Sequence, residues 1–244
     1  MPRALTLCVA MGLALGVIGS PPAAAGDDDG AVAAGVHRAA ADCAEVKCVA
    51  LTFDDGPSRY TERYLKILKR HGAVATFFVI GSQVSGRAST LVTMAAQGNE
   101  IASHTWSHPA LTSLSGGQIR QQVERTARQV AKITGKRPSL LRPPYGSVNG
   151  RVLAALGEAD VAAIMWDVDT RDWQSRSPSA VFGHIKRETH RGSIILMHDL
   201  HRASADALER IIHYLDKRGY TLVTVTDLLG GTVKPGKAYY SGRR

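Results

Sequence analysis

Short apolar runs alternate with amphipathic stretches along most of this chain. The apolar runs favour strands and predict seven of them, at residues 49–53, 75–80, 100–103, 140–142, 161–166, 193–197 and 221–225. The amphipathic stretches predict helices at residues 61–71, 90–97, 115–134, 178–190 and 203–218. A glycine follows each predicted helix within two residues, which favours helix termination and supports the alternation.

Strands that alternate with helices are typical of an α/β fold in which helices cover a parallel sheet. We predict about seven parallel strands, arranged as a distorted (β/α) barrel or as an open doubly wound sheet, because periodicity alone does not separate these folds. Both folds carry their active sites at the C-terminal ends of the strands. Side chains that follow the strands are therefore the first candidates for function.

Polar and ionisable side chains collect directly after five of the predicted strands. They are Asp54 and Asp55 after the first strand, His104 and His108 after the third, Arg142 at the end of the fourth, residues 167–173 after the fifth, and His198 and Asp199 after the sixth. A purely structural barrel would show caps and turn residues at these places. This gathering of chemically capable groups indicates an enzyme. Asp199 has the alternative role of capping the next helix, so we leave it out of the candidate catalytic set.

Two of these groups suggest a metal site. Asp54 and Asp55 are adjacent carboxylates, which repel each other unless a cation or an arginine shares their field, although Asp-Gly-Pro also suits a simple turn. His104 and His108 are four residues apart, so their imidazoles can reach one ion from one side of a helical turn. Two exposed histidines are the alternative. Two histidines and one aspartate would leave positions open for water, as in a catalytic metal site.

Five motifs occur in a fixed order along the chain. They read TFDDGP at residues 52–57, HTWSH at 104–108, RPPYG at 142–146, DTRDW at 169–173 and LMH at 196–198. In these motifs the sequence resembles the polysaccharide deacetylases of carbohydrate esterase family 4, the NodB-homology domain, over about residues 47–229. The resemblance implies a distorted (β/α) barrel that removes acetyl groups from N-acetylglucosamine-containing polysaccharides such as chitin oligomers or peptidoglycan. An O-acetyl esterase acting on acetylxylan and a non-catalytic glycan-binding domain are the alternatives.

The resemblance also implies roles for the residues around the metal. Asp55, His104 and His108 would bind a divalent ion, with zinc the usual metal and cobalt a common substitute. Asp54 would be the general base that takes a proton from the attacking water, and Arg142 would orient it.

The remaining roles concern the leaving group and the substrate. His198 would be the general acid, paired with an acidic residue that we assign as Asp172, with Asp167 and Asp169 as alternatives. The backbone N–H of Tyr145 would stabilise the oxyanion. Tyr145, Trp173 and Pro144 are the expected substrate-binding residues.

The N-terminal segment has the features of a secretory signal. Arg3, an apolar run at residues 4–18 and the sequence PPAAA at 21–25 predict a signal peptide over residues 1–25, with cleavage after Ala25. A membrane anchor is the alternative, but the run is shorter than the roughly 20 residues that span a bilayer. Residues 26–41 would form a flexible lead-in, and residues 42–244 the catalytic domain. We expect a secreted protein, extracellular or associated with the cell wall.

Composition and charge narrow the partners. The chain has 244 residues, of which 44% are hydrophobic, which suits one globular domain and excludes a disordered chain. Its net charge of +9 is scattered and accompanied by no nucleic-acid-binding motif, so we expect a polysaccharide partner, no nucleic acid, no stable membrane anchor and a monomer. Removal of the signal leaves Cys43 and Cys48, which can form a disulfide or remain two thiols.

Overall fold

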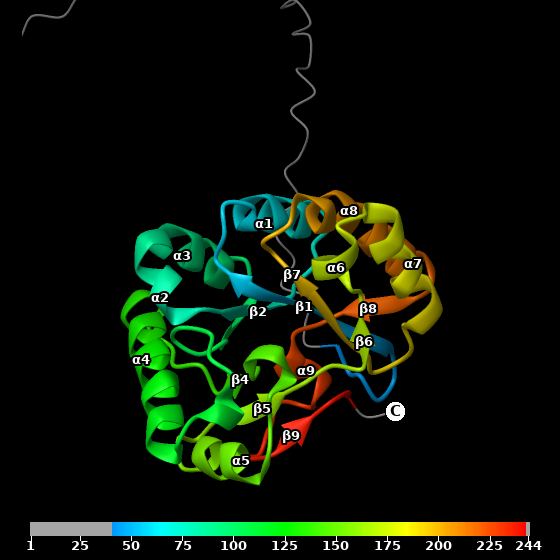
Figure 1. Ribbon diagram of the computed structural model, residues 1–244. Helices are drawn as coiled ribbons and strands as arrows, with labels where there is room; N and C mark the ends of the chain where they lie inside the picture. Colours follow the sequence, from blue (N-terminus) through cyan, green and yellow to red (C-terminus); the bar gives the residue numbers. More distant parts are fainter. Residues whose placement is uncertain (1–40, 243–244) are drawn as a thin grey trace, which may run out of the picture. The chain divides into compact units, whose positions relative to one another are not determined.

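Parallel strands curl into a distorted (β/α) barrel with helices on its outside in the computed structural model, which describes residues 41–242 (Figure 1). The strand order is β6-β7-β1-β2-β3-β4-β5-β9, and β8 also pairs with β1. The bounds of the strands within these residues are β1 Lys47–Gly56, β2 Thr76–Val79, β3 Glu100–Ser103, β4 Leu140–Leu141, β5 Ala162–Ile164, β6 Val168–Asp169, β7 Ile194–His198, β8 Tyr220–Leu222 and β9 Ala238–Tyr239. The barrel implied by the resemblance is thus confirmed.

The seven predicted strands correspond to β1 to β5, β7 and β8. The additional strands β6 and β9 have two residues each, too few to give a recognisable apolar run. Val225, predicted to end the last strand, instead begins a short helix.

Helices connect most of the successive strands and cover the outer face of the sheet (Figure 1). Their bounds are α1 Thr61–Arg70, α2 Gly81–Val84, α3 Ala88–Ala96, α4 Gly116–Thr134, α5 Gly150–Gly157, α6 Asp172–Ser175, α7 Pro178–Glu188, α8 Arg202–Lys217 and α9 Val225–Leu228. The five predicted helices correspond to α1, α3, α4, α7 and α8. The longest, α4, begins with a capping box between Ser115 and Gln118 and ends at Gly135, whose φ of 74° suits a residue without Cβ.

Strand β1 shows why the barrel carries polar groups at one end. Alternate residues face opposite sides of a strand. Val49, Leu51 and Phe53 pack in the cluster that includes residues of α1, α7 and α8 on the outside. Cys48 and Ala50 pack on the enclosed side, with residues of β2 to β5 and β7. The same alternation continues to Thr52 and Asp54, so the enclosed side changes from apolar to polar toward the C-terminal end.

The C-terminal segment helps to join the two ends of the sheet. Strand β9 pairs with β5, and the residues after it reach the start of β7. There Ser241 bridges Ser193, and the N–H of Gly242 donates to the carbonyl of Gly192 at 2.7 Å. Strands β5 and β6 do not pair with each other. These C-terminal contacts therefore link β5 to the start of β7 across that gap in the sheet.

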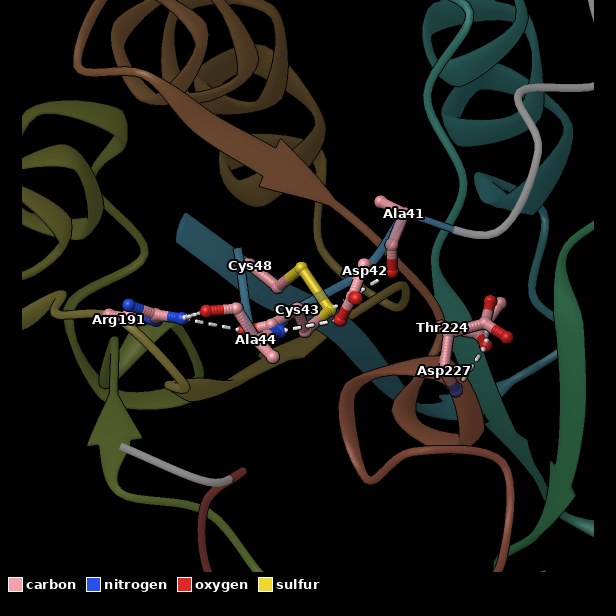
Figure 2. Close-up of a disulfide and its surroundings, with 8 residues drawn as sticks. All are labelled: Ala41, Asp42, Cys43, Ala44, Cys48, Arg191, Thr224 and Asp227. Carbon is pink, nitrogen blue, oxygen red and sulfur yellow. Dashed lines mark hydrogen bonds between the residues drawn. A yellow bond between two sulfur atoms is a disulfide. The ribbon is translucent and has the colours of Figure 1, made fainter. Parts of the chain in front are cut away.

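A disulfide anchors the start of the described chain at the N-terminal end of β1 (Figure 2). Cys43 and Cys48 are joined by an S–S bond of 2.08 Å, which decides between the disulfide and the two thiols. Arg191 donates from Nη2 to the carbonyl oxygen of Cys43 at 2.8 Å and also to that of Ala44. The loop is therefore fastened both covalently and by hydrogen bonds to the segment before β7.

The predicted signal peptide lies outside the described residues, as does the lead-in except for Ala41. Among residues 41–242, no helix has the length and apolar character needed to cross a membrane.

Candidate active site

The predicted site residues meet at one edge of the barrel. Asp54 and Asp55 lie near the end of β1, His104 follows β3, Arg142 follows β4 and His198 ends β7. Because these strands are parallel, their C-terminal ends share that edge. The fold therefore brings together side chains from distant parts of the sequence.

Asp55, His104 and His108 form a cluster of three ligand atoms. Oδ1 of Asp55 lies 3.4 Å from Nε2 of His104 and 3.2 Å from Nε2 of His108, and the two Nε2 atoms are 3.2 Å apart. A tetrahedral ion with bonds of about 2.0–2.1 Å keeps its ligand atoms roughly 3.3–3.4 Å apart. The three atoms are thus spaced to bind one divalent cation.

The electrostatics of Asp55 agree with a cation site. Its Oδ1 is buried and receives no hydrogen bond of good geometry from any residue in the described part of the chain. Burial raises the pKa of Asp55, but the neighbouring His104 and His108 outweigh burial and hold that pKa well below its ordinary value. An ionised, buried oxygen that faces two imidazole nitrogens is well suited to bind a metal.

Hydrogen bonds orient both imidazoles toward Asp55. Nδ1 of His104 lies 2.7 Å from the carbonyl oxygen of Arg142 and can only donate to it, which leaves the lone pair on Nε2 for a metal. Nδ1 of His108 lies 3.1 Å from the hydroxyl of Tyr145. Tyr145 is also one of the residues predicted to bind substrate, so it lies against a proposed metal ligand.

Backbone strain is concentrated in the same place. Asp55, Thr105, His108 and Tyr145 have φ values of 71°, 68°, 62° and 60°. This left-handed conformation costs a residue with a Cβ about 1–3 kcal/mol and persists where the surrounding structure enforces it. The unfavourable backbone geometry at two of the three ligand residues is consistent with a functional site.

Asp54 and Arg142 form a buried ion pair beside the cluster. Nη1 of Arg142 donates to Oδ1 of Asp54 at 2.7 Å and to the hydroxyl of Thr52, also at 2.7 Å. Its Nε and Nη2 donate to the carbonyl oxygens of Ile164 and Met165, at 3.2 and 3.0 Å. Burial lowers the pKa of Arg142, and the charge of Asp54 opposes that effect. Asp54 is therefore held in one orientation by a guanidinium that makes four hydrogen bonds.

His198 and Asp172 form a second pair across the site. Nδ1 of His198 lies 2.8 Å from Oδ1 of Asp172, and the N–H of His198 donates to Oδ2 at 2.8 Å. Burial lowers the pKa of His198, but the hydrogen bond and charge of Asp172 prevail and raise it to about 9. Burial likewise raises the pKa of Asp172, whereas the bond to His198 lowers it, with a net decrease. This pair keeps the imidazole protonated at neutral pH.

The two other aspartates considered as partners of His198 bond elsewhere. Oδ2 of Asp167 lies 3.1 Å from Nε2 of His190, and its Oδ1 accepts the N–H of Ile194 at 2.8 Å. Asp169 accepts the N–H of Arg171 at 2.8 Å. Of the three candidates, Asp172 is the one placed against His198.

The expected substrate-binding residues differ in exposure. Tyr145 and Trp173 are 74% and 49% exposed, which leaves their aromatic surfaces accessible beside the polar site. Pro144 is buried within the short turn that follows Arg142. Its placement suits a residue that fixes the turn, and its predicted contact with substrate stays a prediction.

Sequence reasoning missed three residues that support the site. Gln122 of α4 accepts the N–H groups of Trp106 and Ser107 at 2.8 and 3.0 Å, which holds the loop between the two histidines. Ser204 of α8 donates to Oδ2 of Asp172 at 2.6 Å. Both approach from helices distant in the sequence, so no local pattern indicates them.

Asp199 is the third of these residues, and its alternative role as a helix cap is wrong. The N-cap of α8 is His201. Asp199 is buried beneath the end of β1, where it accepts the hydroxyl of Thr61 and its N–H donates to the carbonyl of Asp54 at 3.3 Å. Burial raises the pKa of Asp199 to about 7. Its position, adjacent in sequence to His198, could have suggested a place near the site.

Comparison with known protein families and curated proteins gives consistent matches. The family model described as polysaccharide deacetylase matches residues 41–164. The chain is 44% identical over 183 residues to the peptidoglycan-N-acetylmuramic acid deacetylase PdaC of Bacillus subtilis, covering 75% of this chain and 38% of that protein. It is 39% identical over 195 residues to the peptidoglycan-N-acetylglucosamine deacetylase PgdA of Listeria monocytogenes, covering 80% of this chain and 41% of that protein. The chain thus spans about two fifths of the length of these relatives.

Solved structures show the same fold. A structure described as T48 deacetylase with substrate superposes with a TM-score of 0.78 at 42% identity, covering 82% of this chain and 99% of the other. The structure of peptidoglycan deacetylase PdaC from Bacillus subtilis gives a TM-score of 0.71 at 42% identity, covering 74% of this chain and 89% of the other.

Proposed function

Because this chain belongs to the polysaccharide deacetylase family and its curated relatives include peptidoglycan deacetylases, we propose that it removes N-linked acetyl groups from peptidoglycan in a metal-dependent reaction. One observation carries this proposal. The predicted ligand cluster, the Asp54–Arg142 pair and the His198–Asp172 pair lie together at one edge of the barrel. Amide hydrolysis needs an activated water, a base and an acid, and these three groups can supply them.

The metal would be held by Asp55, His104 and His108. When bound there, a divalent cation supplies Lewis-acid chemistry, polarising a carbonyl and lowering the pKa of a bound water. We propose zinc, with cobalt able to replace it, because a set of two imidazoles and one carboxylate suits several first-row metals.

Asp54 would act as the general base. Its Oδ1 is occupied by Arg142, whereas its Oδ2 lies 3.8 Å from Nε2 of His104, on the side of the ligand cluster. A water bound beside that cluster can therefore pass its proton to Oδ2. Arg142 fixes the orientation of the carboxylate through the hydrogen bond to Oδ1.

His198 would act as the general acid. An amine is expelled from a tetrahedral intermediate only when it is protonated, so a proton donor is needed on the substrate side of the site. The pair with Asp172 occupies Nδ1 of His198, which leaves Nε2 to face the substrate. With a pKa of about 9, the imidazolium is available at neutral pH.

The choice of peptidoglycan rests on the names of the relatives, which act on its N-acetylmuramic acid or N-acetylglucosamine. It agrees with the proposed secretion of the chain, because the substrate lies outside the cytoplasm. The disulfide between Cys43 and Cys48 also supports an oxidising compartment. We further propose that the protein acts as a monomer.

A substrate panel tests this function. Acetate release should be measured on purified peptidoglycan, chitin oligomers and acetylxylan by zinc-loaded protein, each with and without a chelator. We expect release from peptidoglycan that the chelator abolishes and that added zinc restores. Release from acetylxylan alone would identify an O-acetyl esterase, and binding without release from any polymer would identify a non-catalytic domain.

A further inference from the structure

The loop that joins the two predicted histidine ligands is neither helix nor strand. It comprises residues 104–108 and follows β3 directly. Thr105 and His108 adopt φ values of 68° and 62°, a conformation that is unfavourable for residues with a Cβ. Contacts with the rest of the protein must therefore offset this cost if the two imidazoles are to stay close together.

Gln122 of α4 binds the middle of this loop. Its Oε1 accepts the N–H of Trp106 at 2.8 Å and the N–H of Ser107 at 3.0 Å. Its Nε2 donates to the hydroxyl of Ser107 at 3.1 Å. One half-buried side chain thus makes three hydrogen bonds to two successive residues. These bonds are made to the segment between the ligands His104 and His108.

The N–H groups on either side of that segment have partners close by in the sequence. The N–H of Thr105 donates to the hydroxyl of Ser103 at 3.2 Å, and the N–H of His108 donates to the hydroxyl of Thr105 at 3.0 Å. Local bonds of this kind shape the turn, but they move with it and do not fix its position relative to the barrel. The bonds from Gln122 do fix that position, because they come from a separate helix.

Neighbouring residues of α4 and α2 reinforce this contact. The guanidinium carbon of Arg125, one turn after Gln122, lies 4.2 Å from the centroid of the Trp106 ring, a favourable cation–π geometry. Helix α2 packs beside α4 (Figure 1), and the N–H of Ser82 donates to the carbonyl of Trp106 at 3.0 Å. The middle of the loop is therefore supported by two helices, and Gln122 supplies three of the hydrogen bonds.

We propose that Gln122 is a positioning residue that sets the affinity of the site for its divalent metal. This inference rests on the proposed function, because it concerns the metal site of that function. The Nε2 atoms of His104 and His108 are 3.2 Å apart, so a small displacement of the loop would carry one of them out of reach of an ion bound by the other. Groups that orient metal ligands contribute about 10–100-fold to metal affinity.

Zinc affinity measures this role directly. Metal-free protein should be titrated with zinc in competition with a chromophoric chelator, for the wild type, Gln122→Met and Gln122→Asn. Methionine keeps the length of the side chain without a strong acceptor, whereas asparagine keeps the amide but is one methylene shorter. Both variants should bind zinc about 10–100-fold more weakly than the wild type. Because they remove the contact in different ways, either one can decide the question.

Two further variants are the controls. Gln122→Glu retains an oxygen that can accept both N–H groups and the hydroxyl of Ser107, so it should retain most of the zinc affinity. Gln121→Met changes the same type of residue at an exposed position of the same helix, and it should leave the zinc affinity unchanged. Thermal unfolding of the metal-free proteins separates weaker zinc binding from a loss of folded protein.

The outcomes separate failure of the positioning role from failure of the proposed function. Zinc affinities of Gln122→Met and Gln122→Asn equal to that of the wild type would overturn the role of Gln122, as would an equal loss in Gln121→Met or in Gln122→Glu. A wild type without tightly bound zinc would overturn both. Zinc binding that depends on Gln122, with no acetate release from any polymer, would support the positioning role and refute the deacetylase.

Discussion

Replacing Asp172 by asparagine tests whether this residue sets the protonation state of the general acid. Asp172→Asn keeps the size of the side chain and can still accept the N–H of His198 and the hydroxyl of Ser204, which lie 2.8 and 2.6 Å from Oδ2. It removes the carboxylate whose hydrogen bond and negative charge together raise the pKa of His198 to about 9 despite burial. Without that charge, burial should bring the pKa to its ordinary value of 6.5 or below.

The magnitude follows from the fraction of protonated imidazole. At pH 8 a group with a pKa of about 9 is about nine-tenths protonated, whereas one with a pKa of 6.5 is about one-thirtieth protonated. N-deacetylation by the variant should therefore fall about 30-fold at pH 8, and less than threefold at pH 6, from this cause alone. The loss should grow as the pH rises, because proton donation requires the imidazolium.

The assay is the pH profile of kcat/KM on an N-acetylated oligosaccharide, for wild type and Asp172→Asn. We expect the alkaline limb to move from about pH 9 to pH 6.5 or below. Metal content and thermal unfolding serve as controls, since Asp172 is not a proposed ligand. An unchanged alkaline limb, or a loss equal at every pH, would refute the role given to Asp172.

Three further predictions concern the neighbouring groups and the fold. Asp54→Asn should keep its metal and lose about 10²–10⁴ in rate, whereas Asp55→Asn should bind zinc poorly by metal analysis; reversed phenotypes would exchange their roles. Gly56→Ala should lower the free energy of unfolding by about 1–3 kcal/mol, because a Cβ there would lie 2.5 Å from Oδ1 of Asp199, while Gly86→Ala, which meets nothing within 4 Å, is the control. Equal free energies of unfolding for Gly56→Ala and Gly86→Ala would argue against the close approach of Asp199 to Gly56. Replacing both Cys43 and Cys48 by serine should cost roughly 2 kcal/mol in chemical denaturation, given the short loop they close, and an unchanged midpoint would contradict this.

Much of the site could be predicted because the chemistry follows directly after strands. Asp54, Asp55 and His198 belong to buried strands with clear apolar runs, and the parallel order places their ends together. His104 and His108 do reach one cluster, but from a loop with positive φ at Thr105 and His108; the helical turn that we predicted for them is wrong. Sequence alone could not choose among the three aspartates near Trp173, because that choice depends on which side chain turns toward β7.

The missed features depend on contacts between distant segments. Strands β6 and β9 are too short to show a period, and the pairing that defines them is tertiary. Gln122 and Ser204 act from the helices α4 and α8, at positions whose pattern only predicts a helix face. Asp199 was interpreted as a local cap, whereas burial against Thr61 and Gly56 determines its place.

The most direct test of the central claim is a metal titration of acetate release. Protein freed of metal by a chelator should be titrated with zinc while acetate release from purified peptidoglycan is measured, with His104→Ala in parallel. We expect activity to rise to a plateau at one zinc per chain, and His104→Ala to bind no tight zinc and to release no acetate while remaining folded. Full acetate release by the metal-free protein, or by His104→Ala, would contradict a deacetylase built on Asp55, His104 and His108.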